Sequence, residues 1–276
     1  MKNLLIYVNP SHYFGFEEKI TAKIQIDNSL DLGWKREDIV LVTNFPYEYK
    51  GVKAQIVGDE NYCDFQPTMT KINTIVDLFK GGLFEDGELY WYHDFDVYQN
   101  EVITQSEIET ELVEAEIGLT DKGRMPRWNA GTLFFKKNSA DIFTWTKYLA
   151  YKYKTWDEPA LMALSTNNLL WVIEPKPEIT IGDRVIPVNT IGITGMENVG
   201  ERVKKINISY NFRMWNINST YPTALKPIRA VHFHPYAHLL YNGPDEMGFF
   251  MYGKNKIKTV LMSARLVEIF HKHGLG

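Results

Sequence analysis

Residues 89–98 read LYWYHDFDVY, and this stretch decides the fold. Its first four residues are apolar or aromatic, as in a strand that is buried in the middle of a sheet. Residues two apart in an extended chain point to the same side, so Asp94 and Asp96 are predicted to present their carboxylates together. They would lie at the carboxyl end of a parallel strand, where open α/β sheets bind ligands. The alternative interpretation is a pair of solvated aspartates in a turn.

A second group of polar residues strengthens the prediction of a metal site. Two adjacent carboxylates repel one another, and Mg²⁺ or Mn²⁺ relieves this repulsion because both ions prefer oxygen ligands. The segment AVHFHPYAH holds His232, His234 and His238, and in an extended chain His232 and His234 share one face. An imidazole with two carboxylates suits Mn²⁺, so the sequence predicts a divalent metal site.

The composition narrows the class of protein. The chain has 276 residues, a net charge of −4 and one cysteine, Cys63. The acidic balance argues against a general nucleic-acid binder, which needs a basic surface, and a single cysteine fits a reducing compartment. No apolar run approaches the roughly 20 residues of a membrane-spanning helix. The N-terminal NLLIYVNP is interpreted as a first strand and not as a signal peptide. We therefore expect a cytoplasmic protein, made by a cell or by a virus growing in one.

The hydrophobic pattern of the first hundred residues alternates between strands and helices. Continuous apolar runs predict strands at residues 4–8, 38–44 and 54–59. Apolar residues at helical spacing predict helices at 16–33 and 69–79. This alternation indicates βαβ units, and therefore an α/β fold with a mostly parallel central sheet that is flanked by helices.

The second half of the chain is less regular. The glutamate-rich residues 101–116 predict a solvated helix, and TLFFKKN predicts another strand. Helices are expected after Ser139 and from Asp157, where the aspartate could serve as a plain N-cap. Residues 174–200 are rich in Pro, Gly and Thr and predict loops or a small hairpin, and residues 228–235 predict a late strand.

The C-terminal residues 255–273 carry apolar side chains at helical spacing. The polar face of this predicted helix holds Lys256, Lys258, Arg265 and Lys272. Two interpretations stay open: the helix packs on the domain, or its basic face makes a peripheral contact with an anionic membrane surface.

Taken in order, these segments resemble the GT-A fold glycosyltransferases, which use nucleotide sugars and a divalent metal. The similarity is greatest to the family 8 type, which includes glycogenin and bacterial lipooligosaccharide galactosyltransferases. The matching segments are the βα region 4–59, HDFD at 93–96, WNAGTLFF at 128–135, WDEPALMAL at 156–164, YNFR at 210–213 and HFHP at 232–235. The sequence has Pro235 where the family has glycine, lacks the family's Lys-Pro-Trp, and has His238 where its lysine would stand. It therefore resembles a divergent or viral relative.

The resemblance implies a Rossmann-like single GT-A domain over residues 1–276. Residues 1–100 would be the nucleotide-sugar-binding half, and residues 101–276 the acceptor-side half. The implied ligands of Mn²⁺, or of Mg²⁺, are Asp94, Asp96 and His232. The residues implied at the nucleotide and its diphosphate are Val8, Asn9, Thr43, Asn44, Lys71 and His238. Those implied at the sugar are Asn129, Gly131, Asp157 and Glu158.

The implied activity is transfer of a sugar from a nucleotide sugar, a UDP-sugar, to an acceptor hydroxyl. The acceptor would be a glycan, a protein or a lipid-linked molecule. The candidate catalytic residues are Asp157, Glu158 and Asn129. In an inverting enzyme Asp157 or Glu158 would be the general base; in a retaining enzyme, as in family 8, an oxygen of the leaving phosphate takes the proton. The alternatives are a non-catalytic binding module of the same fold and a sugar nucleotidyltransferase.

Overall fold

The structure is a computed structural model, and it describes most of the chain. The described residues are 1–122, 127–173, 178–181, 184–187, 192–196, 198–213, 221–232, 250–252, 255–257 and 263–274. Of the predicted site residues, His238 lies outside these ranges, as does its neighbour His234.

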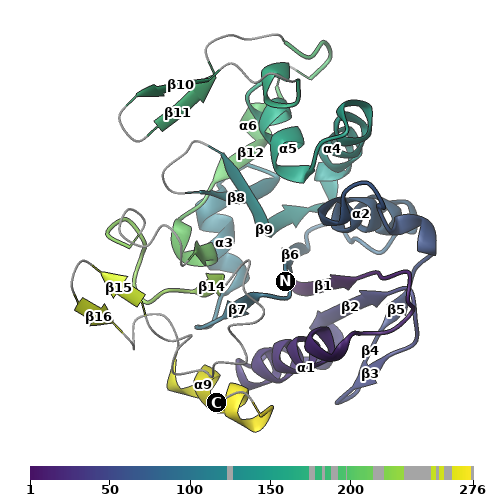
Figure 1. The fold of residues 1–276 in the computed structure, drawn as a ribbon, viewed down its shortest axis with the longest axis vertical. Helices are drawn as coiled ribbons and strands as arrows, with labels where there is room; N and C mark the ends of the chain where they lie inside the picture. The colour runs from purple at the N-terminus through teal and green to yellow at the C-terminus, as the bar shows by residue number, and fades with distance from the viewer. Residues whose placement is uncertain are drawn as a thin grey trace.

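A seven-stranded sheet forms the centre of the molecule (Figure 1). Its strands, in spatial order, are β12 (Val203–Lys205), β8 (Ile117–Asp121), β9 (Trp128–Lys136), β6 (Leu89–His93), β1 (Lys2–Tyr7), β2 (Ile39–Thr43) and β5 (Gln55–Ile56). Strand β9 runs antiparallel to both of its neighbours, and the remaining pairings are parallel. The predicted mostly parallel sheet flanked by helices is confirmed.

Helices cover both faces of this sheet (Figure 1). One face carries α2 (Thr70–Lys80), α4 (Ala140–Tyr153) and α5 (Asp157–Ser165); the other carries α1 (Phe16–Asp31) and α3 (Gln105–Leu112). Successive side chains of a strand point to opposite faces of the sheet, so each strand packs against both layers of helices. In β1, Leu4 packs with the first group of helices and Leu5 packs with α1. Short α6 (Val199–Arg202) lies against α5.

A second, smaller sheet brings a late segment of the chain to the end of β6. It consists of β13 (Phe212–Arg213), β14 (Ala230–His232) and β7 (Val97–Gln99) in that order. Because β14 pairs antiparallel with β7, His232 lies opposite Val97. Three hairpins complete the strands: β3–β4 (Glu48–Tyr49, Val52–Lys53), β10–β11 (Glu178–Ile181, Arg184–Pro187) and β15–β16 (Phe250–Tyr252, Asn255–Ile257).

Most predicted elements are present, with four differences. The helix expected over residues 255–273 is described only as α9 (Ala264–Lys272), because residues 255–257 form strand β16. The strand expected at 54–59 is only two residues long, and the late strand expected at 228–235 is described only as β14. The acidic segment 101–116 contains α3 as expected, because Ile108 and Leu112 are buried beneath it. Residues 113–116 join α3 to β8, a strand that was not predicted from the sequence.

The described part of the C-terminal segment packs on the domain. Helix α9 (Ala264–Lys272) lies beside α1 (Figure 1) and buries Leu266, Ile269 and Phe270. Two of its basic side chains bond to α1: Arg265 donates to Asn28, and Lys272, which stays 58% exposed, donates to Asp27. The interpretation as a packed helix is therefore confirmed for α9, and a peripheral membrane contact of this segment stays a prediction. Among the described residues, no helix is long and apolar enough to cross one.

Candidate active site

The two aspartates lie in a tight turn between β6 and β7. The backbone N–H of Val97 donates to the carbonyl of Asp94 at 3.1 Å, and the N–H of Asp94 donates to Gly131 at 2.9 Å. The prediction of an extended chain through Asp96 was therefore wrong, because β6 ends at His93. The turn, and not strand alternation, brings the two carboxylates together. Phe95 between them packs toward Tyr7 with ring centroids 5.8 Å apart.

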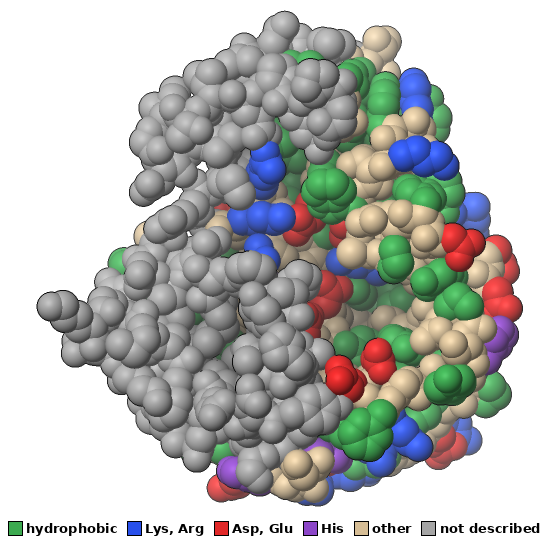
Figure 2. Space-filling view, in the orientation of Figure 1, with side chains coloured by type: hydrophobic (Ala, Val, Ile, Leu, Met, Phe, Trp, Pro, Cys, Tyr) green, Lys and Arg blue, Asp and Glu red, His purple; other side chains and the backbone are tan. Residues whose placement is uncertain are grey.

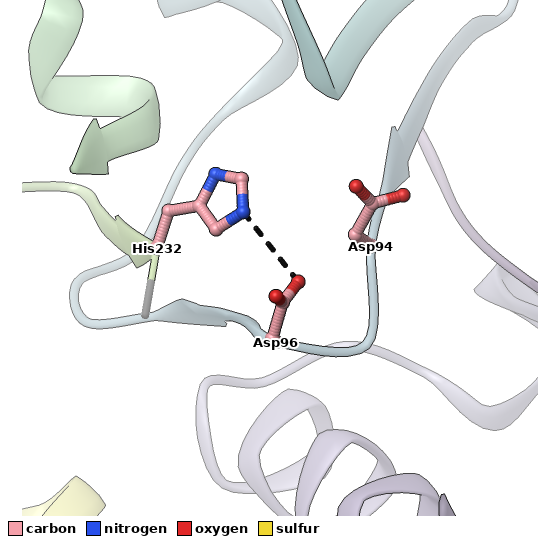
Figure 3. A group of neighbouring side chains, drawn as sticks. All are labelled: Asp94, Asp96 and His232. Carbon is pink, nitrogen blue, oxygen red and sulfur yellow. Dashed lines mark ion pairs between the residues drawn. The ribbon is translucent and has the colours of Figure 1, made fainter. Parts of the chain in front are cut away.

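His232 completes a group of three potential metal ligands (Figure 3). Its Nε2 lies 3.5 Å from Asp96 Oδ1, and one ligand atom from each of Asp94, Asp96 and His232 lies within 4.8 Å of the others. Figure 3 shows the imidazole and both carboxylates turned toward one another from β14 and from the β6–β7 turn. Two hard oxygen donors and an imidazole fit Mn²⁺ well and Mg²⁺ less well.

Asn211 fixes the orientation of the histidine. Its side-chain Nδ2 donates to Thr120 Oγ1 at 3.0 Å, so its Oδ1 faces the imidazole and accepts from His232 Nδ1 at 2.9 Å. A proton on Nδ1 leaves the lone pair of Nε2 directed toward the aspartates. Asn211, Thr120 and His232 are all buried. The sequence analysis noted Asn211 only as a letter of YNFR and gave it no role.

Gly131 is required at its position because of the same histidine. A Cβ added there would lie 2.5 Å from His232 Cε1, closer than any real side chain tolerates. The N–H of Gly131 donates to Asn129 Oδ1 at 2.9 Å, and its carbonyl receives the N–H of Asp94. Asn129 and Gly131 therefore lie beside the metal-ligand group; that they bind the sugar stays a prediction.

Lys71 is a buried cation between two carboxylates. Its Nζ lies 3.0 Å from Asp157 Oδ2 and 3.2 Å from Asp94 Oδ1, and it donates to the carbonyl of Ala130 at 3.0 Å. Burial lowers the pKa of Lys71, but the charges of Asp157 and Asp94 outweigh it and hold the pKa above its ordinary value. The ammonium group is therefore charged and joins the metal-ligand group to α5.

The two acidic residues at the start of α5 have different partners. Asp157 is the first helical residue and makes no capping hydrogen bond, so the N-cap interpretation is wrong. Burial raises the pKa of Asp157, an effect that the nearby ammonium of Lys71 opposes. Glu158 forms an ion pair with Lys122 and accepts the N–H of Ala130 at 3.3 Å.

Two adjoining cavities meet at these residues, and Figure 2 shows the hollowed face with acidic side chains beside it. The first has a volume of about 440 Å³ and the second about 460 Å³. Both are lined by Thr68, Lys71 and Asp94. The first also contacts Tyr7, Val8, Asn9, Tyr62, Tyr92 and Asp96; the second also contacts Asn129, Gly131, Trp156, Asp157, Glu158, Arg213 and His232.

The residues predicted at the nucleotide divide into two groups. Val8 and Asn9 line the first cavity. Asn44 instead supports Asn9, because its Oδ1 accepts the N–H of Asn9 at 3.0 Å and its Nδ2 donates to the carbonyl of Asn9 at 2.9 Å. Thr43 donates its hydroxyl to Phe45. Thr43 and Asn44 thus shape the loop behind the cavity and are not among the residues that line it.

Comparison with solved structures identifies the architecture. The galactosyltransferase LgtC, solved in complex with donor and acceptor sugar analogues, superimposes with a TM-score of 0.52 at 14% identity. The match covers 99% of this chain and 96% of that chain. An active-site mutant of LgtC gives a TM-score of 0.51 at 12% identity, covering 99% and 95%. The chain has the GT-A fold.

A longer glycosyltransferase has the same core. GlyE of Streptococcus pneumoniae TIGR4 matches all of this chain and 60% of its own length, with a TM-score of 0.50 at 12% identity. No protein-family model matches the sequence, and no curated protein is similar to it. The GT-A fold places the carboxyl end of β6, and with it Asp94 and Asp96, at the cleft where the two cavities meet.

Proposed function

We propose that the protein is a glycosyltransferase that moves a sugar from a UDP-sugar to an acceptor hydroxyl with the help of Mn²⁺. One observation carries this proposal: within a GT-A fold, Asp94, Asp96 and His232 bring three ligand atoms within 4.8 Å of one another. They do so beside two joined cavities whose volumes, about 440 and about 460 Å³, suit a ligand of nucleotide-sugar size.

The first cavity would hold the nucleoside diphosphate and the second the sugar. A divalent cation on Asp94, Asp96 and His232 would supply positive charge to the departing diphosphate. Asn211 keeps Nε2 of His232 available for that cation, since Nδ1 already donates to the amide oxygen. Lys71 lines both cavities and fixes Asp94 relative to Asp157.

The partners of the acidic residues favour a retaining reaction. A general base must accept a proton from the acceptor hydroxyl, which requires a carboxylate that the hydroxyl can reach. Asp157 is held by Lys71, and Glu158 is held by Lys122. We therefore assign these two carboxylates to binding the sugar hydroxyls, and an oxygen of the leaving phosphate to taking the proton.

The second cavity opens beside an aromatic side chain that suits an acceptor sugar. Trp156 lines the cavity and keeps 38% of its surface exposed. An indole ring packs well against the C–H face of a pyranose. The acceptor, a free glycan or one linked to protein or lipid, would approach from this side.

Thermal unfolding with nucleotide sugars tests the proposal. A ligand that binds only the folded protein raises the midpoint of unfolding. We expect a rise with UDP-sugars in the presence of Mn²⁺, a much smaller rise without metal, and release of UDP when an acceptor is added. No rise with any nucleotide sugar, with or without Mn²⁺, would contradict the donor and the metal together. A metal-dependent rise with no release of UDP would indicate a binding module instead of an enzyme.

A further inference from the structure

The outer face of α4 displays an unusual group of aromatic and basic side chains. We name it the α4 face and define it by the residues Phe65, Trp145, Tyr148, Tyr151, Lys147, Lys152 and Lys154. The four aromatic residues keep between 36% and 47% of their surface exposed. The inner face of the same helix buries Ile142, Phe143 and Leu149 against the domain. Helical spacing therefore directs large rings outward on the α4 face, although burying them elsewhere would stabilise the fold.

The lysines of the α4 face lie over its rings. Lys152 Nζ lies 5.5 Å from the centre of the Tyr148 ring, Lys147 Nζ lies 5.7 Å from that of Tyr151, and Lys154 Nζ lies 4.5 Å from that of Phe65. In the part of the chain that the structure describes, none of these three ammonium groups has a carboxylate at ion-pair distance. Figure 2 shows basic and hydrophobic side chains together over α4.

Positive charge gathers here in a protein whose net charge is negative. Burial and the charge of Lys80 both lower the pKa of Lys147, so at least one further cation lies near the α4 face. The charge of Asp77 opposes this lowering at Lys147 without reaching ion-pair distance, and an anionic surface would stabilise such a group of cations further. The occupant that complements the α4 face is therefore one that carries many negative charges.

Two features of the α4 face favour a membrane over a sugar chain. A polymer is usually held in a groove with free ring faces for stacking. Here three of the rings project from α4, Phe65 packs beside them with its centroid 5.1 Å from that of Tyr151, and ammonium groups lie over three of the four rings. A flat bilayer surface accepts such a convex face. Tyrosine and tryptophan suit the headgroup region, and lysine suits the phosphates.

We propose that the α4 face docks the protein on a membrane that contains anionic phospholipids. Trp145, Tyr148, Tyr151 and Phe65 enter the headgroup region, and the lysines pair with lipid phosphates. Phe65 directly precedes Gln66, which lines the second cavity, and Lys154 lies two residues before Trp156 at the mouth of that cavity. Docking therefore brings the acceptor side of the cleft near the membrane, which fits a lipid-linked acceptor; this consequence alone rests on the proposed function.

Co-sedimentation with vesicles tests the docking independently of any enzymatic activity. Vesicles of phosphatidylcholine with phosphatidylglycerol are compared with vesicles of phosphatidylcholine alone. We expect binding to the anionic vesicles only, weakening as salt is added. Each lysine near an anionic membrane surface contributes about fivefold to binding. The double variant Lys147→Ser, Lys152→Ser should therefore bind the anionic vesicles about 25-fold more weakly.

Two control variants isolate the α4 face. The double variant Lys53→Ser, Lys204→Ser removes the same charge from exposed positions elsewhere and should bind as the unchanged protein does. Trp145→Ser with Tyr148→Ser should weaken binding even at high salt, whereas Phe16→Ser, at a more exposed aromatic residue on α1, should not.

Three outcomes would overturn the docking proposal. The first is equal binding of the unchanged protein to neutral and anionic vesicles, or none to either. The second is equal weakening by the two lysine double variants. The third concerns the Trp145→Ser, Tyr148→Ser variant. It is that this variant binds vesicles as the unchanged protein does, but has lost binding to a soluble polysaccharide or has changed from dimer to monomer in sedimentation. That result would assign the α4 face to a glycan or to a second copy of the chain.

Discussion

Two groups of charged residues share Asp94, and they are built in opposite ways. In the first, the ammonium of Lys71 lies between the carboxylates of Asp157 and Asp94. In the second, the donors of Asp94, Asp96 and His232 converge on one point. The Lys71 group contains its own cation and supports folding, whereas the three converging donors are arranged to receive one. The difference shows that the role of a charged residue in a cleft, structural or ligand-binding, depends on the charge of its neighbours.

Asp96→Ala should have the largest effect on function and little effect on folding. It removes a metal ligand whose side chain is partly exposed, so the midpoint of unfolding without metal should change little. Transfer should fall about a thousandfold, because the charge that a metal supplies to the leaving group is worth several kcal/mol. Donor-dependent thermal shifts with Mn²⁺ and release of UDP measure the two effects. An intact metal-dependent shift in this variant would show that the ligands lie elsewhere.

Lys71→Met should have the opposite profile. It leaves the buried carboxylate of Asp157 and the partly exposed carboxylate of Asp94 without their cation, which costs about 3–5 kcal/mol in the free energy of unfolding. Denaturant titration measures this loss. Lys122→Met is the matched control, since Lys122 and Glu158 are more exposed and such a pair contributes at most about 1 kcal/mol. Similar losses in both variants would mean that the Lys71 group is not a structural ion cluster.

Asn211→Leu should weaken metal binding without removing a ligand. Loss of the acceptor frees the imidazole of His232 to rotate or to change tautomer, and such outer partners of metal ligands contribute about 10- to 100-fold in affinity. Asn211→Asp keeps an oxygen at the same position and should retain most of the affinity. Calorimetric titration with Mn²⁺ measures both variants. If Asn211→Leu binds Mn²⁺ as tightly as the unchanged protein, the hydrogen bond does not orient the ligand.

The smallest expected effect concerns Asp27. This residue lies between α1 and α9, away from the cleft. Burial raises the pKa of Asp27, but hydrogen bonds from Lys50, Lys272 and His273 outweigh it and leave the pKa below its ordinary value of 3.8. A carboxylate with a lowered pKa stabilises the fold above the unfolded pKa, and this contribution disappears as the pH falls through the folded value. Midpoints of unfolding measured from neutral pH to below 4 should therefore decline less in Asp27→Asn. Parallel curves for the two proteins would contradict this assignment.

The sequence was most informative where the signal is local. The run of apolar residues before Asp94 predicted β6, and the adjacent carboxylates predicted the metal site. The predicted geometry was wrong, because nothing in DFD distinguishes an extended chain from the turn that the structure has. Strand β8 was missed because α3 leads into it with only a few residues between them, and none of them is a proline.

Contacts between distant segments could not be predicted from the residue pattern. Lys71 and Asp157 belong to different helices, and only their packing against the same end of the sheet brings them together. His232 was proposed as a ligand through a family resemblance; its position beside Asp96 follows from the pairing of β14 with β7. Asn211 is the last residue of a short 3-10 helix (Ile208–Asn211), and asparagine is a residue type that usually serves turns and caps.

The contact between Gly131 and His232 has a consequence for how the sequence can diverge. The carbonyl of Gly131 holds Asp94, and the space that its missing side chain leaves is filled by the imidazole of His232. Position 131 therefore cannot change while His232 stays, because a methyl group there excludes the ring, whereas a small residue at 232 removes this reason for glycine. In an alignment of relatives these two columns should vary together, and a protein with alanine at the first is expected to have lost histidine at the second.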